Sequence, residues 1–274
     1  MVGNENEVTR NVDRAPPCGP ISTTVSKALQ VLEAVASEGR AVRFVDLLKS
    51  QPFPKSTLHR LLRTLVSQGM LEHNPEHHTY RPGLRLIRLA HYAWRQSNLP
   101  EAAGDALDAL ASEIAETIHL AVLDHAQVLY VDKRHSEYPM SLYASVGKVA
   151  PAYCTGIGKA MLAYLPEKAL EDALDRQAFH RYTGSTVPDA EALRVELAEI
   201  RRAGYSLDRE EYEPGVICIA VPILSDRRRL HGGLSITGNT RLTNLEKLTA
   251  HAPRLSQAAD EIAAQAALHM LAGA

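Results

Sequence analysis

The chain has 274 residues, of which 45% are hydrophobic, so it is long enough for two domains that each bury a core. Its net charge is -2, but residues 21–97 carry 11 Lys and Arg against 5 Asp and Glu, whereas residues 98–274 carry 17 against 24. Only the first part is therefore suited to meet a polyanion. No apolar run approaches the ~18 residues of a membrane span, and the irregular spacing of three cysteines argues against a disulfide framework and a zinc site.

Residues 1–20 are polar, with three prolines near their end, and they lack the apolar stretch of a secretory signal. They predict a disordered tail on a cytoplasmic protein. Three helices are predicted next, over residues 24–37, 44–49 and 55–68. In the third, apolar residues recur at helical spacing and form one stripe, while serines and arginines project on the opposite side.

Two short strands follow, Met70–His73 and Thr79–Arg81, around a polar hairpin tip. Three helices and a hairpin in this order predict a winged helix-turn-helix over residues 21–83. Residues 84–97 predict a further helix, and Asn98-Leu99-Pro100 then breaks it, so we expect a connector over residues 84–99.

Residues 100–274 predict a second domain in which strands are sequential neighbours and helices flank an antiparallel sheet, which makes the fold class α+β. The predicted helices are 101–117, 156–165, 167–175, 189–203 and 242–270. The predicted strands are 118–123, 128–132, 140–143, 205–207, 216–223 and 230–237.

The N-terminal end of the third helix carries side chains that suit DNA. An α-helix fits the major groove, where Lys and Arg donate to guanine or phosphate and Ser and Thr to either. An isolated helix of this kind would more often be only a solvated surface, but the preceding helix and the following hairpin favour DNA. The predicted DNA-binding residues are Lys55, Ser56, Thr57, His59, Arg60 and Arg63.

Four segments resemble the IclR family of bacterial transcription regulators. They are Pro54–Leu62, which resembles the family's recognition helix, Glu113–Ala121, Gly156–Ala160 and Glu210–Val216. The chain departs from the family at Gln51-Pro52-Phe53, where members often have a glycine before the recognition helix. The resemblance implies a regulator without catalysis, with a GAF-like effector domain. It also implies a homodimer or a dimer of dimers on a double-stranded DNA operator.

The glycine-rich stretch around Gly156 does not fit a nucleotide motif. A P-loop would need glycine at Tyr153 and Ser or Thr at Ala160, and a dinucleotide fingerprint would need glycine at Met161. A tight turn that opens a helix remains, so no cofactor is expected. Its free amides could bind an anion such as a carboxylate, or the glycines could merely let the turn close.

Period-2 alternation places Ser235 and Thr237 on one strand face, and Cys218 can share that face if its strand is adjacent. Taken alone, buried hydroxyls bonded to backbone would be the better interpretation. The resemblance implies instead that a small organic acid binds there. The implied residues are Gly156, Ile157, Asp208, Cys218, Ser235 and Thr237, with an apolar wall from Pro139, Leu142 and Ala150.

The sequence is compatible with two chemical classes of effector. Ala150–Gly156 is similar to family members that respond to keto-deoxy acids from sugar-acid breakdown, but an aromatic acid is an alternative. The function has two rivals, which are an enzyme with a DNA-binding appendage and a purely architectural DNA-binding protein.

Three local features suggest chemistry of other kinds, but no supporting signature accompanies them. Cys154 could be a nucleophile helped by Asp208 and a histidine, but a cysteine of this kind is more often a small buried thiol without a catalytic role. His73, His77 and His78 could bind a metal but lie at a hairpin tip. Arg227–Arg229 is basic but lies in a strand turn, where solvation usually explains charge.

Overall fold

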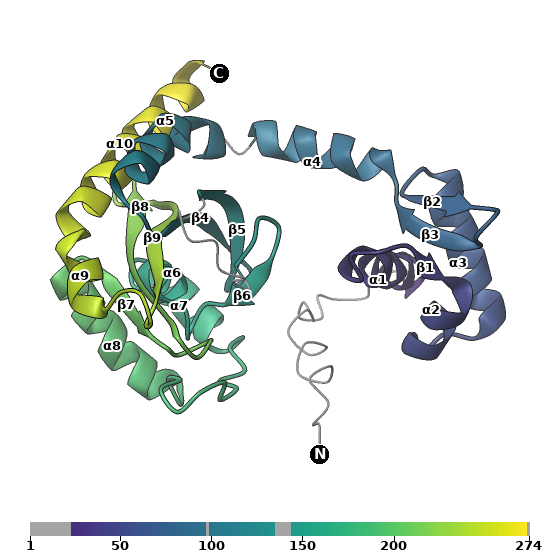
Figure 1. Ribbon diagram of the computed structural model, residues 1–274, viewed down its shortest axis with the longest axis horizontal. Coiled ribbons are helices and arrows are strands. Elements are labelled where there is room, and N and C mark those ends of the chain that lie inside the picture. The colour runs from purple at the N-terminus through teal and green to yellow at the C-terminus, as the bar shows by residue number, and fades with distance from the viewer. Residues whose placement is uncertain (1–22, 97–98, 135–143, 273–274) are drawn as a thin grey trace. The chain divides into compact units, whose positions relative to one another are not determined.

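The computed structural model describes residues 23–96, 99–134 and 144–272. The chain divides between Ser97 and Asn98 into two compact units, and each is described here by itself. The first unit contains α1 (Thr23–Ser37), β1 (Val42–Arg43), α2 (Phe44–Ser50), α3 (Lys55–Ser67), β2 (Leu71–Asn74), β3 (Thr79–Pro82) and α4 (Leu84–Gln96) (Figure 1).

The core of the first unit forms where α1, α2 and α3 turn their apolar stripes toward one another. Four leucines of α3 recur three or four residues apart and are all buried, because this spacing places them on one side of the helix. They pack against buried residues of α1, α2, β1 and β2. The leucines are Leu58, Leu61, Leu62 and Leu65.

A small antiparallel sheet in the order β1-β3-β2 completes this unit. The predicted hairpin is present as β2 and β3, and Asn74 closes its turn by accepting hydrogen bonds from the backbone N–H groups of Glu76 and His77. The two-residue strand β1 was not predicted, because Val42-Arg43 is too short to show a period. Val42 is buried and pairs with Tyr80, which ties the start of α2 to the hairpin.

The second unit is built around one six-stranded antiparallel sheet, in the order β6-β5-β4-β9-β8-β7. Its strands are β4 (Thr117–Asp124), β5 (Gln127–Arg134), β6 (Val149–Pro151), β7 (Ser206–Arg209), β8 (Val216–Leu224) and β9 (Leu230–Asn239). Its helices are α5 (Leu99–Glu113), α6 (Gly156–Leu162), α7 (Glu167–Leu174), α8 (Ala190–Ala203), α9 (Leu245–Ala250) and α10 (Ala252–Ala272).

Helices cover both faces of this sheet (Figure 1). On one face, alternate residues of β4, β8 and β9, such as Ile118, Ile219 and Ile236, form a core with α5 and α10. On the other face the sheet packs against α6, α7 and α8 around residues such as Ile157 and Met161. This α+β arrangement confirms the predicted fold class, and the period-2 alternation of the strands decides which face each side chain joins.

Three main differences separate the predicted elements of this unit from the structure. The helix expected over 101–117 is α5, which begins at Leu99 because Pro100 is tolerated in a first helical turn, where its missing N–H breaks no bond. It ends at Glu113, and β4 starts at Thr117. The strand β6 was not predicted.

The third difference is that the long helix expected over 242–270 is two helices, α9 and α10. The side chain of Asn244 accepts a hydrogen bond from the Lys247 N–H and so fixes the start of α9. Pro253 lacks the N–H that would continue α9, and a new helix starts beside it. The predicted strand 140–143 lies outside the described residues, and no helix within them is both long and apolar enough to cross a bilayer.

Candidate functional sites

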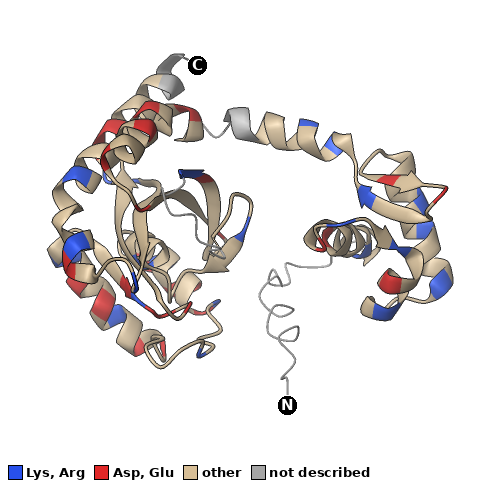
Figure 2. Cartoon of the chain, viewed as in Figure 1, with Lys and Arg blue, Asp and Glu red and all other residues tan. Residues whose placement is uncertain are grey.

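The first site is the exposed side of α3. Pro54 precedes this helix and offers no side-chain cap, so the amides of the first turn face outward. The six residues predicted to bind DNA lie on or beside this exposed side: Thr57 is half-buried, and Lys55, Ser56, His59, Arg60 and Arg63 are exposed. No acidic residue stands on α3, and Figure 2 shows its Lys and Arg in blue. The helix therefore presents a continuous cationic, hydrogen-bonding surface.

The hairpin beside α3 carries the three histidines considered above as metal ligands. Their side chains are exposed; the His73 ring lies 4.8 Å from that of Tyr80 and 6.4 Å from that of His78. Within the described parts of the chain, no three His, Cys, Asp or Glu side chains are grouped as a metal ion would require. These histidines are therefore surface residues of the hairpin.

The second site is a pocket between the sheet and α6. Antiparallel pairing puts Asp208 opposite Cys218, and Cys218 opposite Thr237, across three adjacent strands. Residues paired in this way point to the same face, so the three side chains form one row. Ser235 lies two residues before Thr237 and continues the same face of β9.

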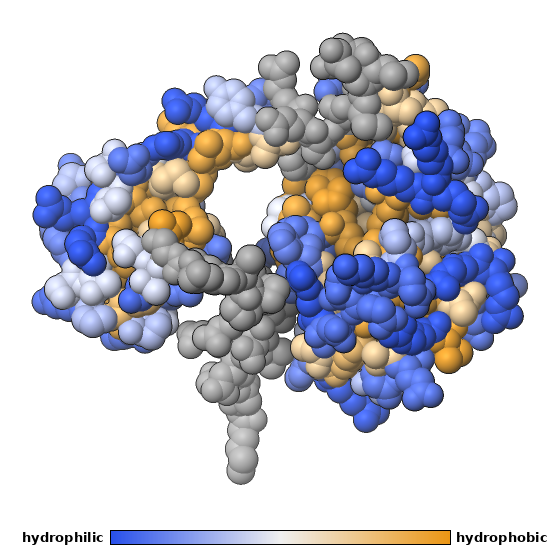
Figure 3. All heavy atoms as spheres, turned by 180° about the vertical axis from the view of Figure 1, so that it is seen from behind, coloured by the Kyte–Doolittle hydropathy of each residue, from blue (hydrophilic) through white to orange (hydrophobic). Residues whose placement is uncertain are grey.

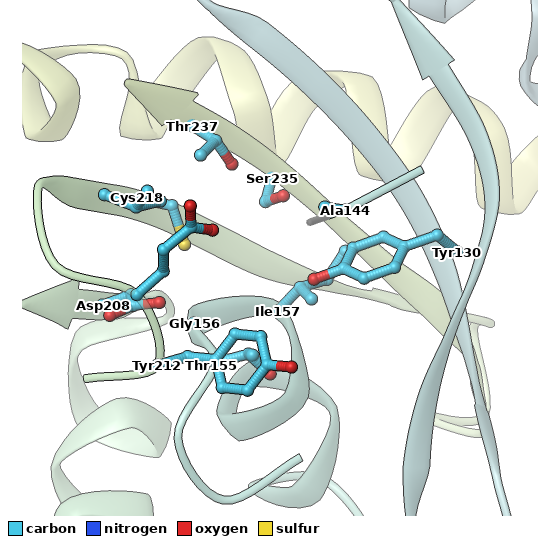
Figure 4. Close-up of a pocket in the computed structure, with 12 residues that line it drawn as sticks. Tyr130, Ala144, Thr155, Gly156, Ile157, Asp208, Tyr212, Cys218, Ser235 and Thr237 are labelled. Atoms are coloured by element: carbon cyan, nitrogen blue, oxygen red, sulfur yellow. The ribbon is translucent and has the colours of Figure 1, made fainter. Parts of the chain in front are cut away.

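Figure 4 shows these side chains facing the same space, which is partly open to solvent. Six of the seven residues predicted to bind an effector line it, and the seventh, Leu142, lies outside the described residues, as does Pro139. Ala150 was expected in the wall but is buried in the core, and Ala144 lines the pocket instead. The described lining residues are Tyr130, Ala144, Thr155, Gly156, Ile157, Asp208, Tyr212, Glu213, Val216, Cys218, Ser235 and Thr237.

Two tyrosines in this lining were missed from the sequence. Tyr130 comes from β5, and its ring centre lies 5.3 Å from that of His119 at a tilt of 57°. The Nδ1 of His119 lies 3.2 Å from the hydroxyl of Thr237. Tyr212 comes from the loop after β7 and meets the Tyr182 ring edge-on at 4.8 Å. The resemblance in Glu210–Val216 pointed to this loop but gave Tyr212 no role.

Glycine at position 156 is required by close packing. A Cβ there would lie 2.4 Å from the sulfur of Cys218, and one at Gly158 would lie 2.4 Å from the carbonyl oxygen of Ala152. The glycines therefore let α6 approach the strands, a role that the sequence did not predict. The amides of this seven-residue helix are not all free for a ligand, because the Gly156 N–H bonds to the side chain of Asp208.

Asp208 is the most perturbed acid of the pocket. It is buried, and its Oδ1 accepts a hydrogen bond of 2.9 Å from the Glu211 N–H. Burial and the nearby charge of Glu211 raise its pKa to about 7, although both backbone donors and the Lys159 ammonium oppose the shift. No Lys or Arg is among the described residues that line the pocket.

Neither of the other two features supports separate chemistry. Cys154 is buried beside Tyr153, and burial raises the pKa of its thiol, which opposes the thiolate that a nucleophile requires. Arg227–Arg229 forms the exposed turn between β8 and β9, where Arg228 lies 5.5 Å from the ring centre of Tyr164.

Comparison with known proteins gives two family matches. Residues 24–75 match the IclR helix-turn-helix domain, and residues 91–264 match the bacterial transcriptional regulator IclR C-terminal family. The chain is 33% identical to the HTH-type transcriptional regulator XynR of Escherichia coli (strain K12), over 87% of this chain and 95% of XynR. It is 32% identical to KdgR of the same strain, over 90% of this chain and 94% of KdgR.

Solved structures agree with these matches. An IclR homologue from Microbacterium hydrocarbonoxydans, complexed with 4-hydroxybenzoate, is similar at a TM-score of 0.77 and 27% identity, over 90% of this chain and 100% of its own. The Thermotoga maritima IclR is similar at a TM-score of 0.72 and 28% identity, over 89% and 98%. Both comparisons extend across both units of the chain.

Proposed function

The chain belongs to the IclR family of DNA-binding transcription regulators, and from this premise we propose that a small organic acid in the pocket of its second unit controls how its first unit binds an operator. The observation that supports this most directly is that the pocket gathers six dispersed residues, from Gly156 to Thr237, between one face of the sheet and α6. The protein then acts by binding alone, without catalysis.

In the proposal, the exposed side of α3 lies in the major groove. Arg60 and Arg63 reach base edges or phosphates, and Lys55, Ser56, Thr57 and His59 contact DNA around the start of the helix. The uncapped first turn behind Pro54 can hold a phosphate with its amides. The buried leucines on the other side keep the helix in place.

Arg60→Ala should weaken operator binding by roughly 5- to 150-fold, since a bidentate contact to a base contributes about 1–3 kcal/mol. The measurement is a mobility-shift titration at fixed salt, with Arg40→Ala as a control, because Arg40 pairs with Glu38 away from α3. Unchanged affinity of the Arg60 variant would remove α3 from the DNA interface.

The lining residues favour a hydroxylated acid as the effector. Hydroxyl groups of Ser235, Thr237, Tyr130 and Tyr212 can donate to ligand oxygens, while the carboxyl of Asp208 can accept from a ligand hydroxyl. Both a sugar-derived keto acid and an aromatic hydroxy acid fit this description, and the relative from Microbacterium hydrocarbonoxydans was crystallised with 4-hydroxybenzoate. To change operator binding, the acid must bind one arrangement of the DNA-binding units more tightly than another, because equal affinity for both leaves their populations unchanged.

The pocket is tested by replacing Ser235 and Thr237 together with leucine. The variant should bind operator normally but lose its response to any acid that shifts the wild type in a thermal screen. A retained response in a reporter assay would remove both residues from the site.

A homodimer is part of the proposal, because two recognition helices on one operator multiply weak half-site affinities. Within the first unit, α1 and α4 expose large apolar side chains, among them Leu29, Leu84 and Ile87, and Figure 3 shows the apolar surface of α4 in orange. Such a surface favours a partner helix. Ile87→Glu should shift the chain to a smaller species in analytical ultracentrifugation; an unchanged mass would exclude α4 from the dimer contact.

A further inference from the structure

Lys159 is a fully buried cation that neither the DNA surface nor the pocket lining uses. It lies on α6 with no side-chain exposure, and its Nζ donates to Glu211 Oε1 at 2.5 Å and to Glu196 Oε1 at 2.6 Å. Glu196 comes from α8 and Glu211 from the loop after β7, so one ammonium group joins three separate elements. The two carboxylates raise the pKa of Lys159 against the effect of its burial, which keeps it charged.

The ion cluster lies between two walls of the pocket. Glu211 directly precedes Tyr212 and Glu213, which line the pocket, and its own N–H donates to Asp208. Lys159 lies on the same helix three residues after Gly156 and two after Ile157, which line the pocket from α6. Lys159 therefore ties the loop that carries Tyr212 to the helix that forms the opposite side of the site.

A second anchor holds the same loop from another direction. The hydroxyl of Thr186 donates to the Glu211 carbonyl at 2.6 Å, and that of Thr183 donates to the Glu210 carbonyl at 2.7 Å. Both threonines belong to the segment before α8, so they hold the loop to that segment. Among the side-chain contacts described for Glu211, the one with Lys159 joins the loop to α6. This contact therefore sets the distance between the loop and the helix.

We propose that Lys159 is a positioning residue of the effector pocket, which holds Tyr212 and Glu213 at a fixed distance from α6 through Glu211. The proposal rests on the assignment of this pocket as the effector site. A purely stabilising role is the alternative, and the two differ in a testable way: buried ion pairs can often be replaced by apolar residues without loss of stability. Replacing Lys159 and Glu211 with apolar residues should therefore keep the protein folded but should not keep the loop in its position.

The test uses the full chain in a Cys18→Ser background and the reaction of Cys218 with N-ethylmaleimide. Cys218 is buried in the pocket lining, so its modification rate reports how far the pocket wall opens, without any effector. In Lys159→Met/Glu211→Leu, cooperative thermal unfolding should be retained while Cys218, identified by peptide mass spectrometry, reacts at least about tenfold faster. The Cys218 rate of the otherwise unchanged chain, measured in parallel, serves as the reference.

The matched control is Arg254→Met/Glu113→Leu, which removes the ion pair between α5 and α10 on the other face of the sheet. Its Cys218 rate should stay within twofold of the wild type. A folded Lys159→Met/Glu211→Leu variant with an equally unchanged Cys218 rate would overturn the proposal. If that variant does not unfold cooperatively, Glu211→Gln replaces it, with an expected acceleration of about threefold and the same overturning result.

A second experiment distinguishes a failure of this proposal from a failure of the proposed function. In the wild type, 4-hydroxybenzoate and a series of sugar-derived keto acids are added before N-ethylmaleimide. Protection of Cys218 that is lost in the Lys159 variant supports both proposals. Absence of protection by every acid counts against the effector pocket, whereas an unchanged Cys218 rate in the variant counts against Lys159 alone.

Discussion

The two sites of this chain are built in opposite ways. The α3 surface is a short stretch of sequence whose acting side chains are exposed, and the leucines behind them only fix the helix. The pocket draws its residues from β5, α6, β7, β8 and β9, and most of them are buried. A surface site can therefore change its side chains freely, whereas each change in the pocket also disturbs the core.

The largest expected effect tests the two sides of α3 against each other. Leu58 is fully buried, so Leu58→Ala should destabilise the first unit by about 2–5 kcal/mol, whereas Arg60→Ala on the exposed side should change stability by less than about 0.5 kcal/mol. Both variants should lose operator affinity, for different reasons. Denaturant unfolding followed by circular dichroism distinguishes them, and a similar stability loss in both would contradict the assigned faces.

The next effect concerns charge in the pocket. The pKa of Asp208 is raised to about 7 in the folded chain and lies near 4 when unfolded, so the native state holds its proton more tightly. Its contribution to stability is therefore fully present below about pH 4 and is lost as the pH rises through 7. Between pH 5 and pH 8 this amounts to roughly 2–3 kcal/mol.

Asp208→Asn should flatten that pH dependence, because the amide cannot ionise. The measurement is the free energy of unfolding of the second unit at both pH values, for wild type and variant. Equal slopes would show that Asp208 does not change its protonation state in this range.

A smaller effect tests how tightly α6 packs on the sheet. Because a Cβ at position 156 would meet the Cys218 sulfur, Gly156→Ala should destabilise the second unit by about 1–3 kcal/mol, and Cys218→Ala in the same chain should relieve part of this. Gly104→Ala is the control, since nothing lies within 4 Å of a Cβ there and alanine favours the helix. Differential scanning calorimetry compares the three, and operator binding should be unchanged in all.

The smallest effect is expected from the exposed ion pair of the hairpin. Arg81 Nη2 lies 2.6 Å from Glu72 Oε2, but both side chains are open to water. Glu72→Gln should cost less than about 1 kcal/mol of stability. A larger loss in thermal unfolding would mean that the hairpin, and not only the core behind α3, supports the DNA surface.

The two sites also differ in how far the sequence predicts them. The α3 surface follows from a local period, which already separates Leu58 from Arg60. For the pocket, the resemblance to the IclR family supplied Asp208 and Cys218, while alternation alone gave only the shared face of Ser235 and Thr237.

What could not be predicted depends on long-range register or on local backbone. Tyr130 is brought opposite Ala121 by a shift in register within β4, and Tyr212 follows Glu210, which has a positive φ of 62°. Neither feature leaves a periodic signal. The break between α9 and α10 was missed because the apolar pattern continues across Pro253, although proline cannot donate the bond that a continuous helix needs.

The pairing of β4 with β9 has a consequence for the order of folding. Thr117 pairs with Thr237, so the centre of the second sheet joins segments 120 positions apart in sequence. A ribosome must release almost the entire chain before this sheet can close, whereas the contacts of the first unit are local and complete early. The first unit, which carries the helix-turn-helix, is thus expected to emerge folded while the second unit is still being made. Under the proposed function, truncated translation products would bind DNA without responding to an effector.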